Sequence, residues 1–432
     1  MEKESLGGVD DLMKRWKLFY TRMGWDKICD FEDKGQLGYM YAIFKDKNIM
    51  DLEKRTEKHT KARPITPFCK HPMKRLLNYA AQGWNFLIKQ LKGEHFILHK
   101  CKDFKAKVKQ LNRKWKHVRK KESRSWDISG CYTHIPKGDV LEALDRVIDL
   151  VRESPALHDV EGVFEGMKSP AIKAKTNKGI INVPKTGKGP AHWGRSSNMD
   201  RVNLTFKQLM DIAKFSLENA YFTMGDKIVQ QTVGLPMGDP LSPAMCIATC
   251  AMHEMDWMQT LPEQLKNKVS FDRYLDDIFL ITNGVKGKEL EDLELNFENN
   301  CYPKCLVLEK TSADEFLEMK VRVDGDEIQI RHWNKNAEHI AAHGKQRYFK
   351  HQHNDSYSCP RAKRGALVGT WTRMIDNTNV EDLRTILDEK VVELQGLNYS
   401  LDTIKKSLCH MQRKQKGKEG FAIENVELSD DK

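Results

Sequence analysis

Two aspartates, Asp276 and Asp277, stand side by side in FDRYLDDIFLI, an otherwise apolar and strand-like stretch of the sequence. Adjacent carboxylates repel each other, and an ionised side chain is costly to bury without a partner. A carboxylate at the turn of a hairpin is a good ligand for a hard divalent cation such as Mg²⁺. The pair indicates a metal site if further carboxylates converge on it, although such pairs are also frequent in surface turns.

A third aspartate, Asp127, lies in a second strand-like segment that we expect to extend from Trp126 to Ile135, before a break at Pro136 and Gly138. A phosphoryl-transfer centre with two metal ions about 4 Å apart needs several carboxylates that come from different elements. Two acidic positions on strands, joined by helices and a glycine-containing loop, fit such a centre for nucleotidyl transfer.

The elements that must hold these carboxylates follow from the spacing of apolar residues and from turn residues. The RPITP segment is expected to be extended, because proline disfavours helix in the residue before it. The other expected elements are helices at about 139–151, 205–219 and 241–258 and through the last hundred residues, hairpin turns at Met224-Gly225-Asp226 and Gly325-Asp326, and an inserted loop or small subdomain at about 160–200.

The charge is basic and unevenly distributed along the chain. The 432 residues carry 72 Lys and Arg against 61 Asp and Glu, a net charge of +11. Lysine and arginine concentrate in two stretches, Lys100–Arg124 and Lys173–Arg195. Such stretches match a polyphosphate partner, because each contact neutralises a phosphate and releases a counterion. Taken singly, either stretch is equally typical of a solvated helix face or a loop.

The length allows a large core in two or three domains, or in one domain with several lobes. No uninterrupted apolar run is long enough to cross a bilayer, so no membrane partner is expected. The N-terminus lacks the apolar core of a secretory signal, which predicts a cytoplasmic or nuclear location.

The ten cysteines are scattered, and we expect reduced thiols rather than disulfides. Cys246 and Cys250 fall on one face of an apolar helix, which predicts core packing. Structural zinc usually needs two close ligand pairs. The other candidates for zinc form no such foursome; they are Cys301 with Cys305, and the group His343, His351, His353 and Cys359.

Five motifs occur in the order found in reverse transcriptases. RYLDDIF resembles their YxDD catalytic signature. DISGCYTHIP resembles their first palm motif, particularly the D-x-x-S-L-Y-T-N-I-P form of Penelope-like elements, and QQTVGLPMGDPLSPAMC resembles the middle motif of that group. ARPITPF resembles the basic fingers motif, and FLEMKV the primer grip, with Glu318 where the group usually has Asp. KRGALVGTWTRMIDNT and ELQGLNYSLDTIKKSL resemble its thumb, so the resemblance spans roughly residues 38–408.

This resemblance implies an α+β fold of the right-hand polymerase type, with fingers, a palm with an antiparallel sheet and the YxDD hairpin, and a helical thumb. The implied domains are an N-terminal region with basic fingers at 1–125, a palm at 126–335 with an insertion near 155–205, a thumb at 336–412 and a charged tail at 413–432. The roughly 20 residues after the thumb are too few for the GIY-YIG endonuclease of many Penelope-like elements, or for an RNase H domain.

The implied activity is RNA-directed DNA synthesis, in which a primer 3′-hydroxyl is extended with dNTPs at two Mg²⁺ or Mn²⁺ ions. The implied partners are an RNA template and a DNA primer, held as an RNA–DNA duplex. Asp127 and Asp276 would ligate the metals, Asp277 would help directly or electrostatically, and the backbone carbonyl of Ile128 would complete the shell. Lys310 would be the general acid that protonates pyrophosphate.

The resemblance also implies contacts with the nucleotide. Arg63 would hold the triphosphate, assisted by Lys58 or Lys61, because the planar fork of arginine suits phosphate oxygens. Tyr132, five residues after Asp127, would be an aromatic steric gate that collides with a ribose 2′-hydroxyl. The remaining implied contacts are Met237 and Gly238 with the nucleotide, and Gly234, Pro236, Phe316, Leu317, Lys363 and Arg373 with template or primer.

Two departures, Asp239 for the usual Ser and His134 for the usual Asn, leave the substrate open; the former puts an extra charge near the template loop. Viral RNA-dependent RNA polymerases usually carry GDD, and an Asp where Tyr132 stands. Telomerase reverse transcriptase needs a large RNA-binding region before the fingers, where fewer than about 40 residues are available. The rival from another class is a reverse-transcriptase-derived scaffold or nucleic-acid-binding protein without catalysis.

Overall fold

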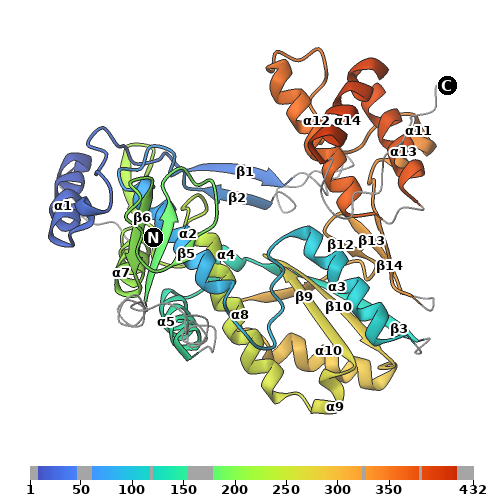
Figure 1. The fold of residues 1–432 in the computed structure, drawn as a ribbon, viewed down its shortest axis with the longest axis horizontal. Coiled ribbons are helices and arrows are strands. Elements are labelled where there is room, and N and C mark those ends of the chain that lie inside the picture. The colour runs from blue at the N-terminus through green and yellow to red at the C-terminus, as the bar shows by residue number, and fades with distance from the viewer. Residues whose placement is uncertain are drawn as a thin grey trace, which may run out of the picture. The chain divides into compact units, whose positions relative to one another are not determined.

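The computed structural model describes residues 8–45, 61–116, 120–153, 179–323, 327–378 and 382–415 (Figure 1). The chain divides into two compact units, each assembled from separate stretches of sequence. The first unit contains Met1–Ile97, Ile128–Pro262 and Glu294–Leu308, and the second contains Leu98–Asp127, Glu263–Leu293 and Glu309–Lys432. Within the described ranges, none of the helices has both the length and the apolar character needed to span a bilayer.

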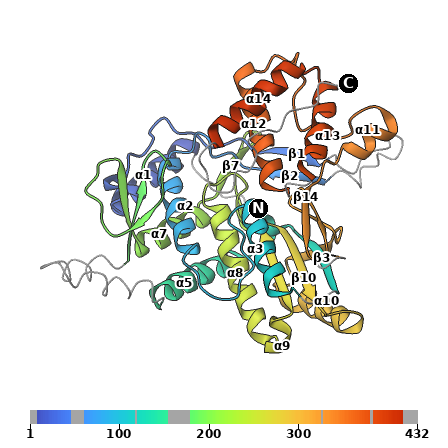
Figure 2. The same ribbon diagram turned by 45° about the vertical axis from the view of Figure 1, so that its right-hand side comes forward.

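A four-stranded sheet carries the acidic residues, in the order β11-β3-β10-β9. Its strands are β3 (Lys121–Ser129), β9 (Val269–Tyr274), β10 (Asp277–Asn283) and β11 (Val307–Lys310). The central strand β10 pairs antiparallel with both β3 and β9. Because β9 and β10 form a hairpin and β3 lies beside β10, residues about 150 positions apart in the sequence meet at one end of the sheet (Figure 2).

Helix α3 (Cys101–Lys114) packs against this sheet through an aromatic cluster. The ring of Phe104 contacts Phe279 of β10 and Phe316 edge-on, and Phe316 stacks on Phe279 at 5.1 Å. Phe316 belongs to a second, three-stranded sheet of the second unit, formed by β12 (Glu315–Phe316), β13 (Met319–Arg322) and β14 (Gln329–His332). One core therefore holds both sheets.

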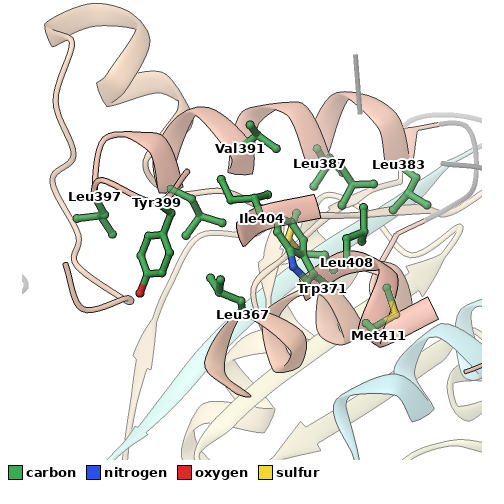
Figure 3. Close-up of a cluster of buried hydrophobic side chains, with 13 residues drawn as sticks. Leu367, Trp371, Leu383, Leu387, Val391, Leu397, Tyr399, Ile404, Leu408 and Met411 are labelled. Carbon is green, nitrogen blue, oxygen red and sulfur yellow. The ribbon is translucent and has the colours of Figure 1, made fainter. Parts of the chain in front are cut away.

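The C-terminal part of the second unit is helical, as its sequence predicts. Its helices are α11 (Ala337–His343), α12 (Pro360–Asp376), α13 (Leu383–Gln395) and α14 (Leu401–Gln415). Helices α12, α13 and α14 enclose the fully buried Trp371, whose indole N–H donates to the Ser407 hydroxyl at 2.7 Å (Figure 3). The hairpin turn expected at Gly325-Asp326 and the tail beyond 415 lie outside the described residues.

The first unit is mainly helical. Its helices are α1 (Gly8–Arg22), η1 (Trp25–Lys27), α2 (Lys74–Ile88), α4 (Cys131–His134), α5 (Lys137–Glu153), α7 (Phe206–Glu218) and α8 (Ser242–Thr260). Its strands are β1 (Tyr41–Lys45) with β2 (Lys61–Ile65), β4 (Ile180–Pro184) between β5 (His192–Trp193) and β6 (Arg201–Thr205), and β7 (Tyr221–Met224) with β8 (Lys227–Gln230). Helix α9 (Glu263–Lys266) belongs to the second unit, and α10 (Lys288–Asn300) has residues in both.

Most of the expected elements are present, but the first acidic strand begins at Lys121, five residues before the expected start at Trp126. The strand expected from Trp126 to Ile135 ends at Ser129, because Gly130 has a left-handed φ of 73° and the chain then turns into α4. The helices expected at 139–151, 205–219 and 241–258 correspond to α5, α7 and α8, and Thr205 caps α7 as a capping box. The described part of the expected insertion, from 179 onward, contains β4, β5 and β6.

Candidate active site

The structure brings the three predicted aspartates together at one end of the four-stranded sheet. Asp277, the first residue of β10, pairs directly with Asp127 of β3, and Asp276 lies in the turn between β9 and β10. One carboxylate oxygen from each residue lies within 4.8 Å of the others. Asp127 and Asp276 are half-buried and Asp277 is exposed. We call these three residues the acidic cluster.

The donors of the acidic cluster suit a hard divalent cation. Carboxylate oxygens are the ligands that Mg²⁺ and Mn²⁺ prefer, and Mg²⁺ commonly uses one or two carboxylates together with substrate phosphates. Three acidic groups within a few ångströms also concentrate negative charge that a cation would neutralise. Ile128 follows Asp127 in β3 with its side chain only 2 % exposed, so its backbone carbonyl is the ligand it has to offer.

An ion pair with a buried carboxylate supports the strand that leads to the YLDD turn. Asp272 of β9 is 0 % exposed, and its Oδ1 lies 2.6 Å from the ammonium of Lys107 on α3. The same ammonium donates to the carbonyl of Phe271 at 3.0 Å. Burial raises the pKa of Asp272 to about 6, although Lys107 opposes the shift. This pair attaches α3 to β9 close to the acidic cluster.

The YLDD turn places a bulky residue in an unfavourable backbone conformation. Tyr274 pairs with Asp277, so Leu275 and Asp276 are the two central residues of the hairpin turn, and Leu275 has a φ of 59°. A left-handed conformation costs a non-glycine residue roughly 1–2 kcal/mol. The guanidinium of Arg273, a residue only 1 % exposed, donates from Nη1 to the carbonyl of Leu275 at 3.0 Å. A hydrogen bond from a charged group contributes about 1.5–3 kcal/mol, enough to offset that cost.

A second turn of the same unit is unusual in the same way. Leu317 and Glu318, between β12 and β13, have φ values of 51° and 64°. The carboxylate of Glu318 accepts from Lys350 Nζ at 2.7 Å and lies 4.0 Å from Arg373. Burial raises the pKa of Glu318, but the hydrogen bond and charge of Lys350, with Arg373, hold it below its usual value. Of the predicted primer contacts, Phe316 is a core residue, whereas the side chain of Arg373 is exposed.

In the first unit, the fingers motif meets the glycine loop, which we define as residues 234–239. The backbone N–H of Thr66, just after ARPI, donates to the carbonyl of Met237 at 2.8 Å. A Cβ on Gly238 would lie 2.1 Å from the Thr66 carbonyl oxygen, so only glycine fits this approach. Pro236 is buried, and its carbonyl accepts from the Ser242 hydroxyl at 2.8 Å.

The first palm motif meets the glycine loop as well. The N–H of Leu235 donates to the carbonyl of Tyr132, and a Cβ on Gly234 would lie 2.6 Å from that same oxygen. Gly234 also has a φ of 75°, so both its conformation and its surroundings require glycine. Tyr132 itself is half-buried on α4. The backbones of three motifs that are distant in sequence thus converge in this unit.

The remaining predicted residues lie apart from these two centres or are engaged elsewhere. Arg63 is exposed on β2 opposite Ile43, and Lys61 begins that strand, while Lys58 lies outside the described residues. Lys310 is exposed at the end of β11, where the next residue hydrogen-bonds to Ser125 of β3 at 2.9 Å. Lys363 is 8 % exposed, and its ammonium donates to the carbonyls of residues 354 and 356 within the second unit.

The carboxylate of Asp239, the last residue of the glycine loop, is buried, with only 3 % of the residue exposed. It accepts hydrogen bonds from the N–H of Leu241, at 2.8 Å, and from the hydroxyl of Ser216. Burial raises the pKa of Asp239 to about 6, against the effect of these two bonds. Sequence reasoning missed this role because Ser216 belongs to α7, 23 positions earlier.

A second group of three potential ligands lies in the core of the first unit. The Sγ atoms of Cys131 on α4 and Cys246 on α8 are 2.8 Å apart, and Cys250 Sγ is 4.0 Å from Cys131. We call these residues the thiol cluster; their exposures are 3 %, 0 % and 0 %. Hydrogen bonding among the thiols, together with burial, raises the pKa of Cys131.

The thiol cluster agrees with the predicted core packing of Cys246 and Cys250, and adds Cys131, which sequence spacing did not indicate. Structural zinc normally has four ligands. Within the described residues, no fourth histidine, cysteine or carboxylate joins this group, and the histidines near Cys359 form no group of three or more that could hold a metal ion. Neutral, buried thiols of this kind pack as small apolar side chains.

Comparison with known proteins places the fold but not the family. No protein-family model matches the sequence, and no curated protein matches it. The structure is similar to that of telomerase from Candida albicans in complex with a TWJ fragment of telomeric RNA, with 13 % identity and a TM-score of 0.50 over 93 % of this chain and 58 % of that chain.

Weaker similarities involve two further structures. For telomerase from Candida tropicalis with the same kind of RNA fragment, the identity is 10 % and the TM-score 0.48, over 92 % of this chain and 56 % of that one. For an RNA-dependent RNA polymerase with vp4 and double-stranded RNA, the identity is 11 % and the TM-score 0.42, over 92 % of this chain and 30 % of that one. This chain thus spans less than two thirds of each, and the Candida albicans match shows the shared fold.

Proposed function

We propose that this chain is a reverse transcriptase of the kind that resembles Penelope-like elements: an RNA-directed DNA polymerase that extends a primer 3′-hydroxyl with dNTPs. The observation that carries the proposal is the acidic cluster, in which carboxylate oxygens from two segments 149 positions apart lie within 4.8 Å of one another. The fold shared with a telomerase chain supports it, and so do the motifs around Asp127, Gly234 and Asp276.

The acidic cluster would act as the metal-binding end of the palm. Asp127 and Asp276 would hold two Mg²⁺ or Mn²⁺ ions, with Asp277 beside them and the carbonyl of Ile128 in the shell. When bound, such ions activate the attacking hydroxyl and stabilise the leaving oxygen of an in-line displacement. Lys310, exposed at the end of β11, would donate the proton that the departing pyrophosphate takes up.

The first unit would hold the nucleotide. Arg63, with Lys58 and Lys61, would bind the triphosphate, because these side chains bring positive charge to phosphate oxygens. Tyr132 would exclude the ribose 2′-hydroxyl. The glycine loop would contact the nascent base pair through Gly234, Met237 and Gly238. Because the N–H of Leu235 donates to the Tyr132 carbonyl, the loop would also position the steric gate.

The RNA–DNA duplex would be bound mainly through its backbone and its shape, as is usual for double-stranded RNA-containing helices. The turn at Phe316 and Leu317 would approach the primer, with Arg373 beside it as an exposed cation. Lys363 would act by holding the 354–356 loop, since its ammonium donates to the carbonyls of residues 354 and 356. The telomeric RNA fragment bound by the Candida albicans neighbour supports an RNA partner for this chain.

The test is primer extension on an RNA template with Mg²⁺ or Mn²⁺, comparing wild type with Asp276→Asn/Asp277→Asn. The matched control is Asp226→Asn, an exposed aspartate that also lies in a two-residue hairpin turn, between β7 and β8. We expect metal-dependent dNTP incorporation by wild type and by the control, and none by the double variant. No incorporation by wild type would favour a scaffold or nucleic-acid-binding protein without catalysis. Efficient use of rNTPs in place of dNTPs would indicate an RNA polymerase.

A further inference from the structure

The position of Asp276 depends on a turn, whereas the positions of its two partners depend on strands. Asp127 and Asp277 face each other across the β3–β10 ladder, whose backbone hydrogen bonds fix both residues. Asp276 has no ladder partner, because it is the second central residue of the two-residue turn between Tyr274 and Asp277. Its carboxylate therefore moves with the conformation of that turn.

The turn has the backbone pattern in which glycine is the usual first central residue. A two-residue hairpin with a positive φ at the first central position but not at the second, as at Leu275 and Asp276, corresponds to a type II′ turn, and glycine dominates the first position because it has no Cβ. Leu275 occupies the position with a φ of 59°, although its side chain makes that conformation unfavourable. Some other contact has to select it.

Arg273 supplies such a contact. It lies on β9, two residues before Leu275, is 1 % exposed, and donates from Nη1 to the Leu275 carbonyl at 3.0 Å. That carbonyl belongs to the peptide unit that links Leu275 to Asp276, and the orientation of this unit distinguishes one turn type from another. Holding the carbonyl therefore also fixes the backbone N–H of Asp276.

We propose that Arg273 is a positioning residue for the metal site: its buried guanidinium holds the Leu275–Asp276 peptide so that Asp276 joins Asp127 and Asp277. The inference rests on the proposed function for its catalytic consequence, but its geometric content concerns divalent-metal binding alone. A merely structural arginine would stabilise the fold without changing metal affinity in the folded protein.

The first readout is Mn²⁺ affinity of the full chain, measured from the free-ion signal in electron paramagnetic resonance. Residues that orient metal ligands typically affect affinity or activity by about 10–100-fold when they are replaced. We expect Arg273→Met to weaken Mn²⁺ binding by about tenfold, and Arg273→Lys, which keeps one charged donor, to weaken it less. The matched control is Arg201→Met in the first unit, whose guanidinium also donates to carbonyls, those of Asn182 and Pro190; it should leave Mn²⁺ affinity unchanged.

The second readout is rescue. Leu275→Gly removes the Cβ that makes the left-handed conformation unfavourable, so the turn should need the guanidinium less. In the Arg273→Met background, Leu275→Gly should recover most of the lost Mn²⁺ affinity. In primer extension, Arg273→Met should lower kcat by about 10–100-fold with little change in the KM for dNTP, and the double variant should recover in parallel.

Unchanged Mn²⁺ affinity in folded Arg273→Met, or affinity that Leu275→Gly does not restore, would overturn the proposal. Thermal unfolding confirms that each variant is folded, and Arg273→Lys provides the same comparison if Arg273→Met is not. The two proposals fail separately. Without dNTP incorporation by wild type, the proposed function is wrong while the Mn²⁺ titrations still decide the role of Arg273; with incorporation but no Arg273 effect, only the positioning inference is wrong.

Discussion

The acidic cluster of the second unit and the thiol cluster of the first are alike in size and opposite in chemistry. Each gathers three potential metal ligands within 4.8 Å, and each joins residues more than 100 positions apart. The carboxylates are half-buried or exposed, whereas all three thiols are at most 3 % exposed. The acidic residues therefore keep contact with water, and the thiols do not.

This difference in exposure decides what each cluster can do. A carboxylate in contact with water can bind a hard cation and leaves coordination positions for a substrate. A thiol binds metals as thiolate, and hydrogen bonding among the three thiols, together with burial, makes that charge unfavourable and raises the pKa of Cys131. Convergence of three ligands is therefore insufficient evidence for a metal site. The charge and solvent access of the ligands decide whether such a cluster can bind a metal ion or only packs in the core.

The largest effect should come from removing one carboxylate. Asp127→Asn should lower dNTP incorporation by about 10³-fold or more, because metal stabilisation of the transition state is worth several kcal/mol and each 1.4 kcal/mol is a factor of about ten. Primer extension at saturating dNTP measures this loss. The matched change in the other cluster, Cys250→Ala, should leave incorporation nearly unchanged. Comparable losses in both variants would abolish the distinction between the two clusters.

The next effect concerns two adjacent residues of α4, one in the thiol cluster and one beside it. Tyr132→Ala should raise the ratio of ribonucleotide to deoxyribonucleotide incorporation by roughly 10–100-fold, because one steric contact in a pocket discriminates by about that factor. Cys131→Ala should not change the ratio, since its side chain lies in the core. An unchanged ratio for Tyr132→Ala would show that the steric-gate assignment is wrong.

The sequence predicted the local features that place the acidic cluster. The apolar run around Asp276 predicted β9 and β10, and the motif order indicated that Asp127 would meet them. The strand expected from Trp126 to Ile135 was displaced: β3 begins earlier, at Lys121, and ends at Ser129, because Gly130 adopts a left-handed conformation. The spacing of apolar residues predicts that an element exists more reliably than it predicts where that element begins and ends.

The features that the sequence did not predict all depend on tertiary contacts. Cys131 joins Cys246 only because α4 packs on α8, and no spacing rule relates residues 115 positions apart. In the same way, the sequence predicted only an extra charge at Asp239 near the template loop, and not the hydrogen bond that its carboxylate accepts from Ser216 of a distant helix. Buried polar partners follow from packing, which a single sequence does not reveal.

Asp239 has the carboxyl chemistry of the acidic cluster and the burial of the thiol cluster, because it is only 3 % exposed. Its folded pKa of about 6 exceeds the ordinary 3.8, so its stabilising contribution is fully present below about pH 4 and is lost as the pH rises through about 6. Asp239→Asn removes the charge, while its amide oxygen can still accept from the Leu241 N–H and its amide N–H can donate to the Ser216 hydroxyl oxygen. The variant should therefore be more stable than wild type at pH 8, by at most about 3 kcal/mol, since one pKa unit corresponds to about 1.4 kcal/mol.

Thermal unfolding at pH 5 and pH 8 measures this gain, which should shrink to about half at pH 5 because the folded wild type is then largely protonated. Asp226→Asn serves as the control, because its side chain lies on the exposed β7–β8 turn and such surface substitutions usually change stability by no more than about 0.5 kcal/mol. A variant of Asp239 that is less stable than wild type at pH 8 would mean that the ionised carboxylate stabilises the glycine loop.

The smallest effect should come from the thiol cluster itself. Cys250→Ala removes one buried sulfur, which should cost about 1–2 kcal/mol, as for the loss of a small apolar group, and lower the unfolding temperature by a few degrees. A chelator that removes thiolate-bound metal should not change the unfolding temperature of wild type, because the three thiols pack as protonated side chains. If the chelator instead lowers it as much as Cys250→Ala does, then the thiols hold a metal despite their burial, and solvent access is not what separates the two clusters.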